Sequence, residues 1–393
     1  MPRGSQPAAP GPFPRSRLAT ALAAAAALIA GCGGDEQGPA PGSRAEQEQP
    51  TELRIGFNED FLGRVHGLSA KEKVRLVRNA GGTMLRTSLD WRSLEPVRDR
   101  WEDSAWIAAA ELYDVALRHG VTPIFVIGFA PDWAREAGGE CGPGSGPGWG
   151  TCELPPRRTM DLHWAEYASE VARRFPEAII EVWNEPNLTA FWDSGPQPER
   201  YADLFMLAER AVRAVAPETP VILAGLIEVK DPEEGMPIGT FLRRTYRARP
   251  QIAERADGIN LQPYPGGTDL GPGSAFERAF DRVRAIRDEF GLRSTPLYVT
   301  EVGVSTAGKE GVTATQQALT MRRVLERVRA MPEVRALLFH RLLSPGDTTD
   351  NPWELGVSWL LPGSYPPPPR PVYCAFVDLA ERLYPGCSAP GAP

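Results

Sequence analysis

The stretch AIIEVWNEPN, residues 178–187, is an apolar run that ends in a carboxylate followed at once by a proline. A strand cannot continue through Pro186, because proline has no backbone N–H to donate to a neighbouring strand. The chain must therefore leave its sheet directly after Glu185. In an α/β barrel, the residues that finish a strand at its C-terminal end face the active site. The stretch predicts a barrel strand that delivers Glu185 as a catalytic carboxylate.

The rest of the chain alternates short strands with amphipathic helices from Leu53 onward. One helix carries apolar residues at positions 164, 168, 171 and 175, the spacing of a face that packs against a barrel wall. Strands are expected at 53–57, 83–89, 122–127, 220–226, 258–262 and 336–339, besides the two runs that end at Glu185 and Glu301. Eight strands and eight helices in 393 residues predict the α/β class and one (β/α)8 TIM barrel, over residues 52–390.

The Trp-Asn-Glu-Pro run at residues 183–186 resembles the fourth strand of the retaining glycoside hydrolases of clan A, the (β/α)8 enzymes that include families 5 and 39. The resemblance implies a second carboxylate at the end of strand seven, and the run PLYVTEVG at residues 296–303 supplies Glu301. It implies that Glu185 is the acid/base and Glu301 the nucleophile of a double displacement, with their carboxyl groups about 5 to 5.5 Å apart. The expected activity is hydrolysis of O-glycosidic bonds in an oligo- or polysaccharide.

These roles require the two carboxyl groups to titrate differently. We expect Arg86 and Tyr264 to keep Glu301 ionised, while apolar surroundings and the charge of Glu301 raise the pKa of Glu185. The alternative for the pair is two solvated or salt-bridged carboxylates at strand ends. For Arg86 the alternative is an arginine that only bridges barrel carboxylates.

The resemblance also implies a sugar-binding shell around the pair. Asn184 matches the family asparagine that binds the sugar 2-hydroxyl, although an asparagine at a strand end also suits a simple turn. Gln262 stands where a histidine usually precedes the tyrosine, and His340 stands where a tryptophan usually lies under the sugar. Residues 129–131, Phe-Ala-Pro, replace another common histidine. We count Gln262 and His340 among the substrate-binding residues, and the altered shell leaves the sugar undetermined.

Aromatic side chains give flat apolar faces on which a sugar can stack. Trp133, Trp353 and Trp359 fall in segments expected at the catalytic mouth, and we predict that they form walls of sugar subsites. A further candidate, Trp149, lies in a Gly- and Pro-rich loop. The alternative for each is core packing, which we assign to Trp91, Trp106 and Trp164.

Composition excludes several classes of partner. The net charge is -7 and no basic run follows the N-terminal region, so a nucleic-acid partner, which needs clustered Lys and Arg, is not expected. Four histidines without the spacing of a zinc site argue against a metal site, and no cofactor is expected. An uncharged carbohydrate remains as the expected partner, bound by a monomer.

The N-terminus has the pattern of an export signal. Arginines precede an apolar run at residues 18–30, and the Ile-Ala-Gly-Cys sequence at 29–32 resembles the cleavage box of bacterial lipoproteins. We therefore expect a signal peptide at 1–31, a lipid on Cys32, a flexible tether over 32–51, and an extracytoplasmic protein that is lipid-anchored or secreted. The alternative is an ordinary secretory signal with an incidental cysteine.

The other four cysteines fall into two neighbouring pairs, Cys141 with Cys152 and Cys374 with Cys387. Each pair closes a short loop, which suits an oxidising compartment, so we predict two disulfides. Free buried thiols are the alternative. A rival to the enzyme remains open too: a carbohydrate-binding surface lipoprotein on the same barrel, with weak or no catalysis.

Overall fold

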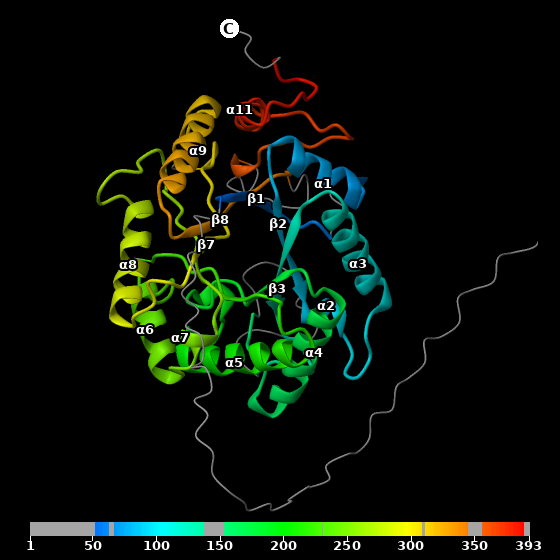
Figure 1. The fold of residues 1–393 in the computed structure, drawn as a ribbon, viewed down its shortest axis with the longest axis vertical. Helices are drawn as coiled ribbons and strands as arrows, with labels where there is room; N and C mark the ends of the chain where they lie inside the picture. Colours follow the sequence, from blue (N-terminus) through cyan, green and yellow to red (C-terminus); the bar gives the residue numbers. More distant parts are fainter. Residues whose placement is uncertain are drawn as a thin grey trace, which may run out of the picture. The chain divides into compact units, whose positions relative to one another are not determined.

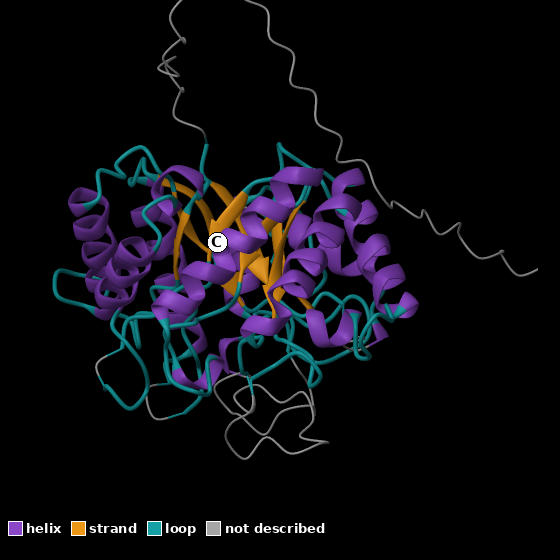
Figure 2. Cartoon of the chain, turned by 90° about the horizontal axis from the view of Figure 1, so that it is seen from below, coloured by secondary structure: helices purple, strands orange, loops and turns teal. Residues whose placement is uncertain are grey.

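The computed structural model describes residues 52–62, 67–136, 153–229, 231–308, 311–344 and 356–388. Eight parallel strands form a nearly closed barrel within this part of the chain, and helices surround them (Figures 1 and 2). The strands are β1 (Arg54–Asn58), β2 (Met84–Asp90), β3 (Thr122–Gly128), β4 (Ile179–Val182), β5 (Val221–Leu223), β6 (Ile259–Leu261), β7 (Leu297–Val299) and β8 (Val334–His340). The predicted TIM barrel is confirmed.

The sheet order is β5-β4-β3-β2-β1-β8-β7-β6, so β5 and β6 meet at the seam. Isolated parallel bridges, Ile222 to Gly258 and Leu226 to Leu261, join the seam. β5 ends at Leu223, earlier than the expected residue 226. The reason is that the next backbone N–H groups donate to side chains: Ala224 to the Tyr201 hydroxyl at 2.8 Å and Gly225 to Glu181 at 2.9 Å.

The helices follow the apolar periodicity of the sequence. Long helices are α1 (Ala70–Asn79), α3 (Asp103–Arg118), α4 (Asp161–Arg174), α5 (Pro198–Val215), α6 (Ile238–Ala248), α8 (Ala275–Glu289), α9 (Ala314–Arg329) and α11 (Pro371–Leu379). Short turns of helix are α2 (Trp91–Leu94), α7 (Ile252–Arg255), η2 (Arg158–Met160) and η3 (Thr189–Phe191). Capping boxes start α1, with Ser69 and Glu72, and α9, with Thr313 and Gln316, because these side chains bind the unpaired N–H groups of the first turn.

The barrel interior changes from apolar to polar along the strands. Six buried apolar residues form a cluster separate from the main core: Met84, Ile124, Ile179, Ile222, Ala336 and Leu338. Side chains of a strand alternate between its two faces, so a residue two positions further along shares the same face. Those residues include Arg86, Glu181 and His340, and all three are buried. An apolar layer thus lies beneath a charged layer at the C-terminal ends of the strands.

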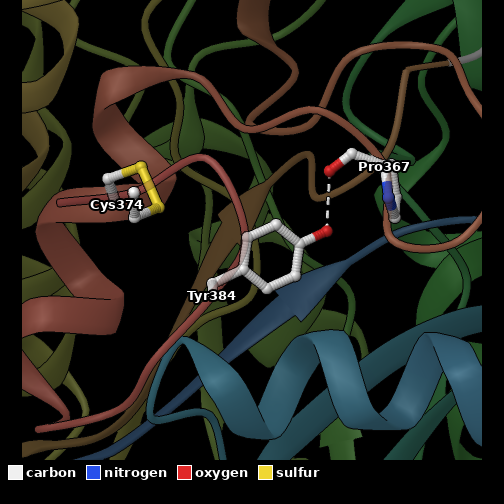
Figure 3. Close-up of a disulfide and its surroundings, with 4 residues drawn as sticks. Pro367, Cys374 and Tyr384 are labelled. Atoms are coloured by element: carbon white, nitrogen blue, oxygen red, sulfur yellow. Dashed lines mark hydrogen bonds between the residues drawn. A yellow bond between two sulfur atoms is a disulfide. The ribbon is translucent and has the colours of Figure 1, made fainter. Parts of the chain in front are cut away.

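Cys374, on α11, is joined to Cys387 by a disulfide with an S–S distance of 2.04 Å (Figure 3). In the same region the Tyr384 hydroxyl donates to the Pro367 carbonyl at 2.7 Å (Figure 3). This predicted disulfide is confirmed. The Cys141–Cys152 pair, Cys32 with the rest of the N-terminal region, Trp149 and Trp353 lie outside the described residues. The helices that are described include none with the length and hydropathy needed to span a bilayer.

Candidate active site

The turn after β4 fixes the position of Glu185. Trp183 and Glu185 have positive φ angles, 73° and 41°, in a region that L-residues seldom occupy. Neighbouring strands hold this turn. The Trp183 N–H donates to the Ile127 carbonyl at 2.7 Å, and the Glu185 N–H donates to the Gly225 carbonyl at 3.1 Å. The turn therefore has one defined shape, in which Glu185 is buried with 6% of its surface exposed.

Glu301 lies two residues beyond β7, and one donor from β2 and one from the segment after β6 hold its carboxylate. Arg86 donates through Nη1 to Oε1 at 2.5 Å, and the Tyr264 hydroxyl donates to Oε2 at 2.7 Å. The Nδ1 atom of His340 lies 3.6 Å from Oε2. The contacts expected from Arg86 and Tyr264 are present, and they orient both oxygens of the carboxylate.

Burial raises the pKa of Glu185 well above its ordinary value, and the negative charge of Glu301 adds to the rise. The nearby charge of Arg86 opposes the shift, while that of Glu181 reinforces it. No described residue donates a hydrogen bond to the Glu185 carboxyl group. Burial and the charge of Glu301 therefore both favour the protonated form of Glu185, in the direction expected for an acid/base.

Arg86 connects these groups, and each of its five N–H bonds has an acceptor. Nε and Nη2 donate to the two oxygens of Glu181 at 2.7 and 2.8 Å. Nη1 donates to Asn58 at 2.9 Å and to Glu301, and Nη2 also donates to Asn184 at 2.7 Å. Burial alone lowers the pKa of Arg86, but the charges of Glu181 and Glu301 outweigh it and raise the pKa above its usual value.

Asn184 is oriented by two donors on its amide oxygen. Arg86 donates to this oxygen, and Gln262 donates to it through Nε2 at 3.2 Å. The amide NH2 group of Asn184 is consequently the part left to donate to a ligand. Gln262 is fully buried, so it supports Asn184 and does not reach a substrate. The prediction that Gln262 contacts the sugar directly is wrong, because its side chain is fully buried and donates to Asn184.

Hydrogen bonding also fixes the tautomer of His340. The Asn58 amide oxygen accepts from Arg86, so its amide nitrogen must be the donor to His340 Nδ1 at 2.8 Å. His340 Nδ1 is then an acceptor, and in the neutral ring the proton lies on Nε2. Arg86 thus sets the orientation of His340 through Asn58.

Sequence reasoning missed Glu181 and Asn58 as members of this site. A carboxylate inside an otherwise apolar strand, as in Ile180-Glu181-Val182, was the available signal for Glu181, because a buried charge needs a partner. Asn58 has the weaker signal of a polar residue at a strand end. Strand pairing places Asn58 beside Arg86 and His340, and only the tertiary structure shows this pairing.

The predictions that Trp359 and Trp133 form walls of sugar subsites have different outcomes. Trp359 is fully buried, and its ring lies within 4.8 Å of the rings of Phe57, Phe339 and Phe376, measured between centroids. The prediction that it forms a sugar subsite is therefore wrong, since it packs between the barrel and α11. Trp133 is half-buried after β3, where its indole N–H donates to the Glu95 carbonyl at 2.9 Å. Its stacking role stays a prediction.

The three tryptophans assigned to packing are buried as expected: Trp91, Trp106 and Trp164. Trp91 stacks on Tyr167 with ring centroids 5.5 Å apart, and its edge meets Trp133 at 5.3 Å. Trp133 therefore packs against the buried Trp91–Tyr167 pair.

A second charged group lies where β2 ends. Arg92 donates to both oxygens of Glu153 at 3.0 and 3.2 Å, and its Nη2 lies 3.4 Å from Asp90. Its guanidinium also lies over the ring of Phe129, 5.3 Å from the centroid. Burial raises the pKa of Glu153 to about 7, although Arg92 opposes the shift. Sequence reasoning missed this cluster, because Glu153 comes from a segment far along the chain.

Metal-ligating side chains do not gather in the parts of the chain that the structure describes. No group of three or more His, Cys, Asp or Glu side chains among them could hold a metal ion. We therefore name no residue as a metal or cofactor ligand.

Comparisons with known proteins support the fold. No family model matches the chain. A solved family 39 glycoside hydrolase from Bacteroides cellulosilyticus WH2 aligns with a TM-score of 0.58 and 20% identity, over 84% of this chain and 64% of that one. A GH5_18 protein from Bifidobacterium longum subsp. infantis aligns with a TM-score of 0.58 and 14% identity, over 86% and 81%.

Among curated proteins, a beta-xylosidase from Geobacillus stearothermophilus is 28% identical over 137 residues, which is 32% of this chain and 26% of that protein. The chain thus matches about a quarter of the length of this relative and under two thirds of the family 39 structure. The resemblance to clan A glycoside hydrolases is confirmed at the level of the fold.

Proposed function

We propose that this chain is a retaining glycoside hydrolase that cleaves O-glycosidic bonds of an oligo- or polysaccharide, with Glu185 as acid/base and Glu301 as nucleophile. One observation carries the proposal. Two strand-end carboxyl groups share one buried site in different surroundings: Arg86 and Tyr264 bind Glu301, while burial and the charge of Glu301 raise the pKa of Glu185.

The first step uses this difference between the two groups. Glu185 gives its proton to the leaving glycosidic oxygen as a carboxylate oxygen of Glu301 attacks the anomeric carbon. The carbon–oxygen bond to the leaving group breaks, and a glycosyl ester to Glu301 forms. Arg86 and Tyr264 hold Glu301 in the direction of attack, and both hydrogen bonds weaken as its charge is consumed.

The second step follows from the same electrostatics. Once Glu301 is an ester, its negative charge no longer raises the pKa of Glu185, so that pKa falls. Glu185, now ionised, takes a proton from water, and the water oxygen attacks the anomeric carbon and releases Glu301. Asn184 presents its amide NH2 group to the sugar 2-hydroxyl, as its two bound donors require.

The experiment is a panel of 4-nitrophenyl β-xyloside, β-glucoside and β-mannoside with plant and bacterial polysaccharides. The β-xyloside comes first, because the matched curated relative is a beta-xylosidase. Early product anomers are followed by NMR. We expect retained β configuration, and loss of kcat/KM by more than about 10⁴-fold in Glu301→Gln. Inverted product contradicts the assigned roles.

A carbohydrate-binding protein without turnover is the second candidate, favoured by the altered residues at positions 262 and 340. It predicts sugar binding that Glu301→Gln leaves intact and no hydrolysis by the unaltered protein. Calorimetric titration identifies the sugars that the unaltered protein binds, and the hydrolysis assay on those sugars separates the two candidates, because only the enzyme cleaves what it binds.

We further propose that a lipid on Cys32 anchors the protein outside the cytoplasm. The support is the apolar run followed by the Ile-Ala-Gly-Cys box. Cys32→Ala in a bacterial host should abolish incorporation of labelled palmitate. Unchanged labelling contradicts the anchor.

A further inference from the structure

We propose that Glu181 is a positioning residue of the reaction, which holds Arg86 in the orientation that lets one guanidinium bind Glu301, Asn184 and Asn58 together. The inference rests on the proposed function and extends it to a residue that does not touch substrate. Glu181 is fully buried within β4, four residues before Glu185.

The planar geometry of the Arg86 guanidinium explains how Glu181 can orient it. Its five N–H bonds lie in one plane, so a carboxylate that binds one edge of the plane fixes the direction of all the others. Glu181 binds the Nε and Nη2 edge with both oxygens. The remaining N–H bonds then point to Glu301, Asn58 and Asn184.

Glu181 is also linked to the backbone of the acid/base. Its Oε1 accepts the Gly225 N–H at 2.9 Å, and the carbonyl of the same glycine accepts the Glu185 N–H at 3.1 Å. Gly225 thus joins the Glu181 carboxylate to the strained turn that carries Glu185. Loss of Glu181 therefore frees both Arg86 and one support of that turn.

The charge of Glu181 has a separate effect. The charged groups that act on Glu185 are Glu301, Arg86 and Glu181, and the polar groups against Glu301 are Tyr264 and His340. Removal of one negative charge from this set favours the ionised form of Glu185. The acid/base then loses its proton at a lower pH.

Glu181→Gln tests both effects in the full-length protein. Its amide NH2 group would face an N–H of Arg86, donor against donor, so the guanidinium must turn. We expect kcat/KM to fall about 100-fold, as a shift of about 1 Å in a reacting group does. The basic limb of the kcat/KM profile should move to lower pH by about one unit.

Glu181→Asp separates position from charge. Its shorter side chain keeps the negative charge but draws Arg86 away from Glu301. We expect kcat/KM to stay low while the basic limb returns to its original pH. This variant also covers the case in which Glu181→Gln does not fold, because its expected pH profile alone distinguishes a positioning role from a structural one.

Glu209→Gln is the matched control. Glu209 is 1% exposed on α5 and accepts from Arg255 at 3.0 and 3.2 Å, so it is an equally buried carboxylate outside the site, although its arginine partner is more exposed than Arg86. It should lower stability without changing the pH profile. The inference is overturned if both Glu181 variants keep kcat/KM within about threefold of the unaltered protein. It is also overturned if the basic limb of the kcat/KM profile has the same pH in Glu181→Gln and Glu181→Asp.

Failure of the inference differs from failure of the proposed function. If the unaltered protein hydrolyses glycosides, Glu301→Gln is inactive and both Glu181 variants behave as the control does, only this inference fails. If the unaltered protein hydrolyses no glycoside, or if Glu301→Gln remains active, the proposed function fails, and the inference falls with it.

Discussion

At the scale of single residues, the site depends on one guanidinium shared among several acceptors. A single Arg86 cannot neutralise Glu181 and Glu301 fully, so the site keeps an excess negative charge close to Glu185. Excess negative charge and burial act in the same direction on that carboxyl group. Burial is the largest cause of the raised pKa of Glu185, and the charge of Glu301 adds to it because Glu301 shares its one cation with Glu181.

Glu185→Ala is predicted to lower kcat/KM by an amount that depends on the leaving group. A poor leaving group needs the proton of Glu185, so methyl β-glycosides should lose about 10³-fold or more, and 2,4-dinitrophenyl β-glycosides should lose far less. Added azide should restore turnover of the dinitrophenyl substrate, because an anionic nucleophile needs no base. An equal loss for both leaving groups contradicts the acid role.

Glu153 provides a prediction about stability and pH. Its pKa in the folded protein is about 7, against 4.5 ordinarily. The folded protein thus holds a proton that the unfolded chain releases, and the resulting stabilisation is complete below about pH 4.5 and is lost as pH rises through 7. Between pH 5 and pH 8, the free energy of unfolding should fall in both proteins. The fall should be smaller in Glu153→Gln than in the unaltered protein, by on the order of 2 kcal/mol.

Urea unfolding of both proteins at the two pH values measures this difference. Glu166→Gln removes the same charge from an exposed position on α4 and serves as the control. Equal pH dependence in the Glu153 variant and the unaltered protein would show that Glu153 does not titrate in this range.

At the scale of elements, the residues that follow a strand end form contacts that build the site. β5 ends early because the next backbone N–H groups, of Ala224 and Gly225, bind the side chains of Tyr201 and Glu181. Gly225 shows the constraint most clearly. A Cβ atom at this position would lie 2.5 Å from Nε2 of Gln262. Only glycine therefore lets Gln262 reach Asn184.

Gly225→Ala is predicted to push Gln262 away from Asn184. The free energy of unfolding should fall by about 1 to 3 kcal/mol, and kcat/KM should fall about tenfold, since Asn184 loses one of its two donors. Gly239→Ala is the control, because its Cβ on α6 would meet nothing closer than 3.9 Å. That variant should be neutral or slightly more stable, as helix propensity favours alanine. Equal effects at the two positions contradict the argument.

At the scale of the whole molecule, α11 completes the ring of helices beside β8. Its Phe376 packs on Phe339 of β8 and on Trp359, with centroid distances of 4.9 and 4.7 Å. The disulfide between Cys374 and Cys387 holds the segment after α11 against this helix. Covalent and apolar contacts thus act on the same part of the barrel wall.

Replacement of both Cys374 and Cys387 by Ala is predicted to lower stability by up to about 3 kcal/mol, since the bridge closes a loop with a sequence separation of 13. In a chain of this size, that loss corresponds to a fall in Tm of about 5 °C. Thermal melts of the variant and the unaltered protein provide the measurement, and activity at 25 °C should not change. An unchanged Tm contradicts a stabilising role for this bridge.

The sequence alone predicted Glu301 and its partners Arg86 and Tyr264 through the resemblance to clan A. It predicted the barrel and the strand that carries Glu185 from local signals, since an apolar strand that stops at a proline and a helix face of period 3.6 are visible within ten to fifteen residues. The disulfide at Cys374 and Cys387 was accessible for the same reason, because its partners are close in sequence.

Only the tertiary structure decided which side chains meet. Glu181 and Asn58 enter the site through the register of β1, β2 and β4, and register joins residues far apart in the chain. The sequence placed Trp359 at the mouth and Gln262 against the sugar, but the fold buries both, because burial depends on what packs around a residue and not on its type. Local sequence therefore determined which groups reach the strand ends, and packing across the barrel decided how they bind one another.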